Sequence, residues 1–450
     1  MEGGISGIVK AALYKPLSNK DHQSIINILF AAEKLFRLIA YVFVLYMIGI
    51  AVVFPFFINE GYNYIFVSSL VLIVGIGVFA QYYFGITYQI LLQADQKWYI
   101  TSLLQASTLI VNTIITVVLI KLNTNIHIIK IANSLVFIIR PLILLTYVKH
   151  KYNLQKNKTN NNYKLSQKWD GIGHHFAYFL HNTTDVIVIT LFINVVEVSV
   201  YSIYSMIVVG IRSLIMTFTS GIEAAFGNMI ANDEKEILNK NFELIEFISF
   251  FVTTVLFTSS AILILSFIAI YTNGVNDTNY IRPMFAYTLI ISEAIYCIRI
   301  PYHSLISAAG HFKQTRNGAF IEAFINISLS IILVSSLGLL GVALGTLIAM
   351  LFRTLQYVYY LSKNIINRKM VLFFGKLFIN MIGVVMVLTI NNLLNQYVPS
   401  NYAEWFVYAV IVTIFTTTIL GVFNLIFYYN LIIEVVKIFK RMFSVRFQLK

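Results

Sequence analysis

The dominant feature of this sequence is a succession of long apolar segments. About twenty apolar residues in a helix cross a bilayer, and within lipid only helices or closed barrels satisfy every backbone hydrogen bond. The sequence therefore predicts an all-α, polytopic integral membrane protein. About twelve transmembrane helices are expected, at residues 37–58, 64–92, 100–120, 126–148, 173–194, 198–218, 243–271, 280–308, 317–336, 340–361, 371–391 and 404–430.

The composition agrees with this prediction. Residues of the AVILMFWYC set make up 58% of the 450 positions and charged residues 11%, against about 45–50% and about 25% in soluble domains. The single cysteine, Cys297, excludes an internal disulfide. No His/Cys cluster has the spacing of a metal site. The net charge of +13 is attributed to membrane topology rather than to nucleic-acid binding, so no nucleic-acid partner is expected.

The distribution of Lys and Arg predicts the orientation of the chain. Most of the 32 Lys and Arg residues lie in alternate loops and in the two tails. The positive-inside rule makes that side cytoplasmic, together with both termini. Lys121, Lys130 and Arg282 lie at the opposite ends of the spans, and Arg140, Arg212, Arg299 and Arg353 lie inside them.

A weak internal repeat divides the chain into two lobes. An offset of 214 residues (220 minus 6) aligns Ser6–Ile8 with Ser220–Ile222, and Arg140 falls one residue from the counterpart of Arg353. The order of spans and charged loops superimposes as well, as in a duplicated transporter whose parallel halves enclose a central cavity. The predicted parts are an N-terminal lobe (1–148), a basic cytoplasmic linker (149–172), a six-helix C-terminal lobe (173–361), an extra two-helix hairpin (362–430) and a basic tail (431–450).

The two copies differ at the start. The second copy begins near Gly171, so its counterpart would begin about forty residues before Met1. The N-terminal lobe is therefore expected to have four full helices and to lack a first helix and most of a second.

Several segments resemble a known family. These are "ALYKPLSNKD", "HNTTDVIVITLFI", "AAGHFKQTR", "NISLSIILVSSLGLLGVALGT" and "FRTLQYVYYLSKN". They are similar to the polysaccharide or O-antigen flippase-like branch of the multidrug/oligosaccharidyl-lipid/polysaccharide (MOP) flippase superfamily, whose members normally have complete first and second helices. The resemblance implies a transporter of the bacterial cytoplasmic (inner) membrane. It would flip a polyprenyl-pyrophosphate-linked oligosaccharide by alternating access of two lobes, for surface polysaccharide biosynthesis. The implied partners are that lipid-linked oligosaccharide, membrane lipids and the polysaccharide polymerase machinery.

The four arginines inside spans are the candidate substrate-binding residues. A charge within the bilayer costs at least a few kcal/mol, so each such residue is a functional candidate. Guanidinium groups bind phosphates through forked, charge-assisted hydrogen bonds. We therefore expect Arg140, Arg353, Arg299 and Arg212 to line a cavity that takes the pyrophosphate. The alternative is that they are interfacial anchors or members of intramembrane ion pairs.

Two carboxylates near the middle of the membrane are candidates for energetic coupling. Asp185 and Glu293 could take up and release a proton, or hold Na⁺, while the cavity alternates. His181 lies one helical turn before Asp185 and could pair with it. The alternative is a structural ion pair. No cofactor is expected beyond a possible H⁺ or Na⁺ as coupling ion.

Three other functions were weighed. A multidrug or organic-cation antiporter of the same superfamily should have an acidic and aromatic pocket, and four arginines against two deep carboxylates favour an anionic substrate. A membrane enzyme such as a polysaccharide polymerase needs a sizeable outward loop, whereas the predicted outward loops are short, so the protein is not expected to be an enzyme. A truncated, non-functional product is the remaining alternative.

Overall fold

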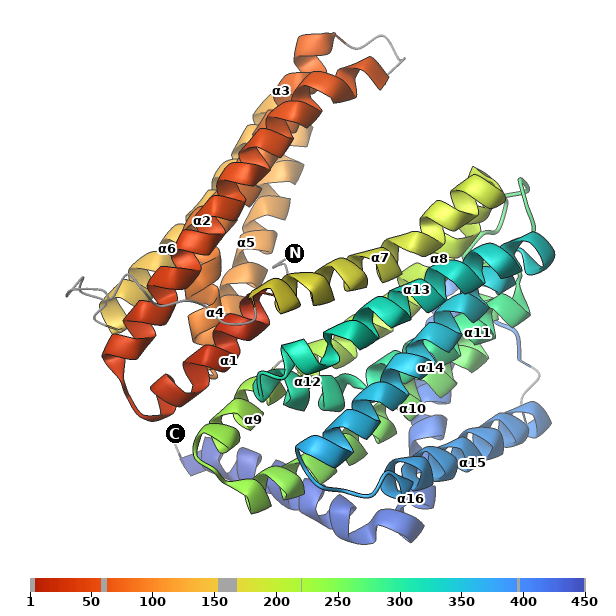
Figure 1. Cartoon of the computed structure of the whole chain (residues 1–450). Helices are drawn as coiled ribbons and strands as arrows, with labels where there is room; N and C mark the ends of the chain where they lie inside the picture. The colour runs from red at the N-terminus through yellow and green to blue at the C-terminus, as the bar shows by residue number, and fades with distance from the viewer. Residues whose placement is uncertain (1–4, 58–62, 153–167, 220, 395–396, 449–450) are drawn as a thin grey trace. The chain divides into compact units, whose positions relative to one another are not determined.

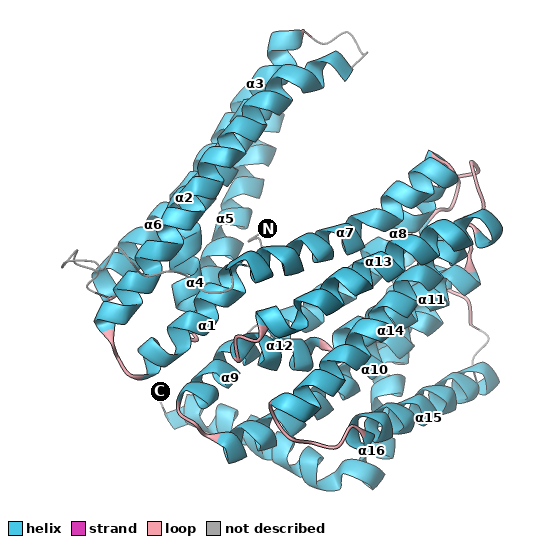
Figure 2. Cartoon of the chain, in the orientation of Figure 1, coloured by secondary structure: helices cyan, strands magenta, loops and turns pink. Residues whose placement is uncertain are grey.

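The computed structural model describes residues 5–57, 63–152, 168–219, 221–394 and 397–448. These residues form helices and no strand (Figures 1 and 2), which confirms the all-α prediction. Eleven helices in this part of the chain are long and apolar enough to cross a membrane. The span predicted at 173–194 falls on α7 (Lys168–Phe192), which is not among those eleven. The chain is a multi-pass membrane protein.

The chain divides into two compact units. The first unit contains residues Met1–Gly171, Glu223–Asp233 and Ala308–Gly310, and the second contains Ile172–Ile222, Glu234–Ser307 and His311–Lys450. The main division, at residues 171 and 172, lies at the end of the predicted linker. Residues 153–167 of that linker lie outside the described residues, as do the side chains of the predicted tail beyond Lys437.

The first unit is a bundle in which α1 packs against α2 and α4, α3 against α2 and α6, and α5 against α6. The predicted span at 64–92 is interrupted by a π-helix, an unusual feature that often marks functional sites. The elements of the first unit are α1 (Ile5–Ser18), α2 (His22–Val53), the 3₁₀-helix η1 (Phe54–Phe57), α3 (Tyr64–Ala80), the π-helix η2 (Gln81–Gly85), α4 (Ile86–Ala94), α5 (Trp98–Lys121), α6 (Ile126–Lys151) and α9 (Ile222–Ala231).

The second unit is larger and includes the predicted extra hairpin. Helix α14 packs on α13 and α11, and α10 packs on α11, α15 and α16. The expected span at 280–308 is broken at Arg299 into α11 and α12. The elements after α7 are α8 (Val195–Thr219), α10 (Lys235–Tyr271), α11 (Pro283–Ile298), α12 (Ile300–Ala308), α13 (Phe312–Leu337), α14 (Leu339–Asn364), α15 (Val371–Leu394) and α16 (Tyr402–Gln448).

The predicted repeat is visible in the backbone. Helix α5 begins at Trp98 and α13 at Phe312, which are 214 residues apart (312 minus 98). The turns before these helices contain residues with positive φ at the same offset (310 minus 96), namely Gln96 at 57° and Gly310 at 71°. Left-handed backbone is uncommon outside glycine, so its recurrence at equivalent turns supports the duplication more strongly than the low sequence identity does.

The breaks in two long helices also correspond. The π-helix of the first unit ends at Gly85, and Arg299 stands at the equivalent position (299 minus 85 is 214), where α11 ends. In the first unit a Cβ at Gly85 would lie 2.7 Å from Pro141 Cβ. Only glycine therefore allows α6 to approach the break this closely.

Candidate functional site

The second unit holds a buried carboxylate surrounded by neutral oxygen and nitrogen groups. Helix α7 carries Asp185, whose residue surface is only 4% exposed. The Tyr201 hydroxyl on α8 donates to Asp185 Oδ2 at 3.0 Å, and Asn326 Nδ2 on α13 lies 3.4 Å from Oδ1. The Thr346 hydroxyl on α14 lies 3.1 and 2.9 Å from the two carboxylate oxygens. Four helices thus converge on one acidic group, and we call these four residues the Asp185 cluster.

The Asp185 cluster is short of positive charge. Among the side chains that the structure describes, no Lys, Arg or His bonds to Asp185; the side chain of His181 lies outside them. The fully buried Asn326 also has an amide oxygen that accepts no hydrogen bond. Carboxylate, amide and hydroxyl oxygens are the ligands that hard cations prefer. The cluster is therefore chemically suited to hold a small cation, or to take a proton onto the carboxylate.

The other proposed coupling residue, Glu293, has a cationic partner. Arg212 Nη1 on α8 lies 3.1 Å from both carboxylate oxygens of Glu293 on α11. Both side chains are buried. The structure thus pairs Glu293 with Arg212, a contact that the spacing in the sequence does not reveal.

One aromatic ring contacts both Arg212 and a second arginine. The guanidinium carbon of Arg212 lies 4.9 Å from the ring centroid of Tyr296, and that of Arg299 lies 4.5 Å from the same ring. Both distances suit cation–π attraction, which strengthens where water is excluded. Tyr296 is therefore a shared neighbour of the two arginines.

Arg299 and Arg353 share one carboxylate. Arg299 Nη1 lies 2.7 Å from Glu322 Oε1, and Arg353 Nε lies 3.4 Å from Glu322 Oε2. Arg353, at 2% exposed, also donates to the Thr315 carbonyl at 2.9 Å and the Tyr357 hydroxyl at 2.7 Å. Its Nη2 lies 3.3 Å from His174 Nδ1.

Together these side chains form a buried network. It contains three guanidinium groups, those of Arg212, Arg299 and Arg353, and two carboxylates, those of Glu293 and Glu322. Removing one member of such a network leaves an uncompensated buried charge, which costs several kcal/mol. The arginines thus hold the second unit together, and their guanidinium groups are covered by protein in this conformation.

Arg140 lies in the first unit and differs from the other three arginines in its burial and in its neighbours. It is half-buried on α6, and its Nη2 lies 3.4 Å from Gln89 Oε1 on α4. Gln81, the first residue of the π-helix, donates to the same Gln89 oxygen at 3.0 Å. The chain Arg140–Gln89–Gln81 therefore places polar groups at a helix break. The glutamines were not among the predicted site residues.

The structure also contains a charged cluster that the sequence analysis missed. Glu246 on α10 is 0% exposed and accepts from Arg368 Nη1 and Nη2 at 2.6 Å each and from Lys376 Nζ at 2.6 Å. Tyr302 on α12 donates to it as well. Burial alone would lower the pKa of Arg368, but its hydrogen bonds to Glu246 raise that pKa above its usual value. Arg368 therefore stays charged.

The sequence did contain signals for the missed residues. Glu246 lies within a predicted span, three residues from its expected start, and a charged residue inside a span is itself a signal. Lys376 was counted with the loops, although the structure buries it in α15. Asn326 aligns with Asn112 in the repeat, and both amides fall inside spans. Repeated amides in apolar helices were the available clue.

Comparison with known proteins identifies the fold. No protein-family model matches the chain, and no curated protein matches it in sequence. Among solved structures, a mutant of the Vibrio cholerae MATE transporter VcmN matches with a TM-score of 0.64, 13% identity, and coverage of 81% of this chain and 86% of that chain. An outward-facing multidrug resistance MATE family transporter of the MOP superfamily matches with a TM-score of 0.60, 12% identity, and coverage of 80% and 82%.

A flippase has the same fold. The inward closed conformation of the lipid II flippase MurJ matches with a TM-score of 0.56, 14% identity, and coverage of 96% of this chain and 98% of that chain. At these identities the likeness concerns the fold. The chain therefore has the helical fold found in MATE transporters and in the lipid II flippase MurJ.

Proposed function

We propose that this protein is a transporter that flips a polyprenyl-pyrophosphate-linked oligosaccharide across the bacterial inner membrane, for surface polysaccharide biosynthesis. Both termini would be cytoplasmic. The observation that carries the proposal is the group of three buried arginines in the second unit, Arg212, Arg299 and Arg353, which share the two carboxylates of Glu293 and Glu322, with Arg140 in the first unit in addition. The similarity in fold to a lipid II flippase over 96% of the chain supports it.

The network suggests how a pyrophosphate would be bound. Glu322 is shared by Arg299 and Arg353, so each arginine has only part of a counter-charge. A pyrophosphate offers more negative charge and more acceptor oxygens than one carboxylate, and guanidinium groups match its geometry. In a conformation that admits substrate, the phosphates would replace Glu322 as the partner of the two arginines.

The Asp185 cluster would provide the coupling. A buried carboxylate with neutral hydrogen-bond donors is stabilised when it binds Na⁺ or H⁺. Because the cluster joins four helices, cation binding would favour the conformation in which these helices lie together. Glu293, paired with Arg212, would couple this step to the arginine network. His181 keeps its proposed role as a partner of Asp185.

The test is transbilayer movement in proteoliposomes. The full chain is reconstituted with a fluorescent polyprenyl-pyrophosphate-linked oligosaccharide, and dithionite quenching measures the fraction that crosses. Wild-type protein should accelerate crossing, whereas Arg353→Gln and Arg140→Gln should slow it by about tenfold or more, the loss expected for one charge-assisted hydrogen bond. Arg37→Gln removes an exposed arginine paired with Glu33 and serves as the matched control.

Crossing that is equally fast for wild type and both variants would overturn the assignment of the arginines.

For the coupling step, crossing is compared under Na⁺, H⁺ and choline gradients. Asp185→Asn should abolish the dependence on the gradient, and the exposed loop variant Asp277→Asn should keep it. A gradient response that survives Asp185→Asn would remove Asp185 from the mechanism.

The second candidate function is a multidrug or organic-cation antiporter. The Asp185 cluster favours it, because a buried carboxylate without a described cationic partner could bind an organic cation, and several similar structures are MATE transporters. Uptake of ethidium by the same proteoliposomes, with no movement of the lipid-linked substrate, would support this candidate instead.

A further inference from the structure

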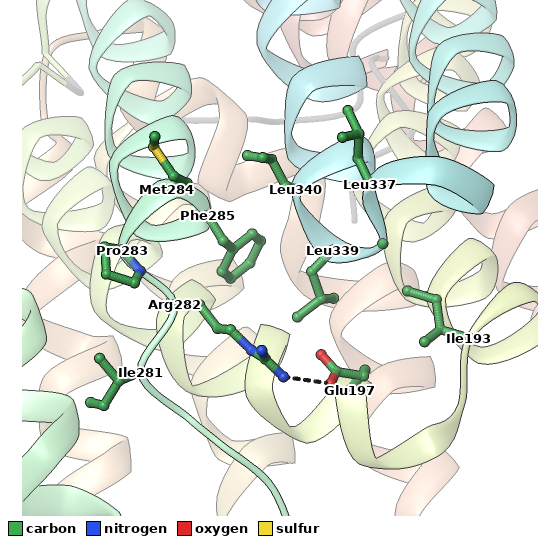
Figure 3. Close-up of a pocket in the computed structure, with 11 residues that line it drawn as sticks. Ile193, Glu197, Ile281, Arg282, Pro283, Met284, Phe285, Leu337, Leu339 and Leu340 are labelled. Atoms are coloured by element: carbon green, nitrogen blue, oxygen red, sulfur yellow. Dashed lines mark hydrogen bonds and ion pairs between the residues drawn. The ribbon is translucent and has the colours of Figure 1, made fainter.

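The second unit has a pocket at the ends of its helices, and none of its lining residues belongs to the Asp185 cluster or to the arginine network. It has a volume of about 440 Å³ and is formed where α7 and α13 end and where α8, α11 and α14 begin (Figure 3). These ends are opposite to those next to the basic loops. In a membrane-spanning unit such helix ends lie at the level of the lipid headgroups.

The lining is apolar except for one ion pair. Phe285 and Leu339 are buried, whereas Met284 at the rim is 72% exposed. Arg282 Nη2 lies 3.0 Å from Glu197 Oε1 (Figure 3). This bond uses one of five guanidinium N–H groups and one of two carboxylate oxygens. The side chain of Arg282 is 38% exposed, so its other N–H groups are accessible to a ligand.

The backbone at Gly338 borders this pocket. Gly338 joins α13 to α14 with φ of 55° and ψ of −134°, a conformation that residues with a Cβ rarely adopt. No atom lies within 4 Å of the position that a Cβ would take there. Arg282 is fixed at the start of α11 because its backbone N–H donates to the Tyr204 hydroxyl at 3.0 Å, and Tyr204 in turn donates to the Tyr280 carbonyl at 2.8 Å.

We propose that this pocket binds the headgroup of a zwitterionic phospholipid, phosphatidylethanolamine. The phosphate would bind Arg282 and the primary ammonium would bind Glu197, so the two charges of the ligand meet the two charges of the site. The apolar rim would take the upper part of the acyl chains, which continue along the exposed face at Met284. A purely anionic headgroup would meet Glu197 with like charge, and a trimethylated headgroup cannot donate a hydrogen bond to it.

The test is equilibrium binding of short-chain lipids to the purified full-length protein, measured by native mass spectrometry. Dioctanoyl phosphatidylethanolamine should bind about tenfold to a hundredfold more tightly than dioctanoyl phosphatidylcholine or phosphatidylglycerol, the range expected for one hydrogen bond to a charged group. Free phosphoethanolamine should bind at least about tenfold more weakly than the lipid, because it lacks the chains that bury apolar surface.

Three variants and one control locate the site. Arg282→Gln and Glu197→Gln should each weaken binding by about tenfold or more. Leu340→Trp, which fills the pocket and keeps the ion pair, should do the same. Lys240→Gln breaks the exposed pair of Lys240 with Glu434 and should leave binding unchanged.

The proposal is overturned if phosphatidylcholine or phosphatidylglycerol binds as tightly as phosphatidylethanolamine. It is equally overturned if phosphoethanolamine alone binds as tightly, which would indicate a soluble ligand, or if none of the three pocket variants weakens binding.

Discussion

Ser18 and Asn232 are counterparts in the two repeats, 214 residues apart, and their side chains are hydrogen-bonded to each other. Ser18 is the last residue of α1, and Asn232 directly follows α9. These two helices occupy equivalent positions in the two copies. Nearby, Lys10 pairs with Glu223 at 3.0 Å, and a Cβ at Gly227 would lie 2.2 Å from the Tyr14 ring. The ends of the two copies thus contact each other through equivalent surfaces.

This contact can be trapped. In a Ser18→Cys, Asn232→Cys protein, mild oxidation should form a disulfide that shifts the band on a non-reducing gel. The native Cys297 is buried and should not compete. The two single-cysteine variants are the controls, and a failure of the double variant to cross-link would contradict the contact. If transport requires the contact to open, the cross-linked protein should be inactive until it is reduced.

The Glu246 cluster should be a main source of stability for the α15–α16 hairpin. Glu246→Gln leaves Arg368 and Lys376 without a counter-charge and should lower the free energy of unfolding by about 3–5 kcal/mol. Lys376→Met keeps the Glu246–Arg368 pair and should cost less. Glu434→Gln, which breaks an exposed pair, should change stability by about 0–1 kcal/mol.

Tryptophan fluorescence would measure this effect. Trp405 on α16 packs on Phe267 of α10 with ring centroids 5.0 Å apart, so its emission reports whether the hairpin remains docked. Equal denaturation midpoints for Glu246→Gln and Glu434→Gln would show that the cluster contributes little.

The contact between α13 and α14 requires glycine. A Cβ at Gly341 would lie 2.3 Å from the Leu333 carbonyl oxygen, and a backbone atom cannot move aside cheaply. Gly341→Ala should therefore destabilise the protein by about 1–3 kcal/mol through overpacking. Gly210→Ala is the matched control, because no atom lies within 4 Å of its Cβ position; it should be neutral or slightly stabilising. Thermal unfolding in detergent distinguishes the two, and identical midpoints would contradict the prediction.

Two substitutions of Thr346 should show whether its hydroxyl group or its size matters for cation binding by the Asp185 cluster. If it binds Na⁺, Thr346→Val should remove most of the thermal stabilisation that Na⁺ gives relative to choline, because valine keeps the shape of threonine but lacks the oxygen. Thr346→Ser should retain it. Stabilisation by Na⁺ that is equal in Thr346→Val and wild type would exclude this hydroxyl as a ligand.

Much of the fold could be predicted from the sequence. Apolar segments of about twenty residues are recognisable without any knowledge of contacts, because the bilayer imposes their length. The repeat offset was also visible, and the positive φ values at Gln96 and Gly310 are consistent with it at the backbone level. The break at the π-helix was missed, since it depends on how neighbouring helices pack rather than on local hydrophobicity.

The candidate site was only partly accessible to the same reasoning. Arg212, Arg299 and Arg353 were recognised because charges are rare in spans, but their partners could not be chosen from the sequence. Each carboxylate partner lies on a different helix from its arginine, 81 residues away for Arg212 and Glu293. Spacing within one helix, which suggested His181 for Asp185, carries no information about such contacts.

The sequence by itself determined that this chain spans a membrane with a duplicated set of helices, because hydrophobic length and charge placement act locally and are largely independent of the final packing. Only the tertiary structure decided which charges neutralise one another, that Asn326 and Thr346 meet Asp185, and that Glu246 ties the last hairpin to the second unit. Electrostatic energy in a low-dielectric interior depends steeply on distances of a few ångströms, and those distances exist only once the helices have packed.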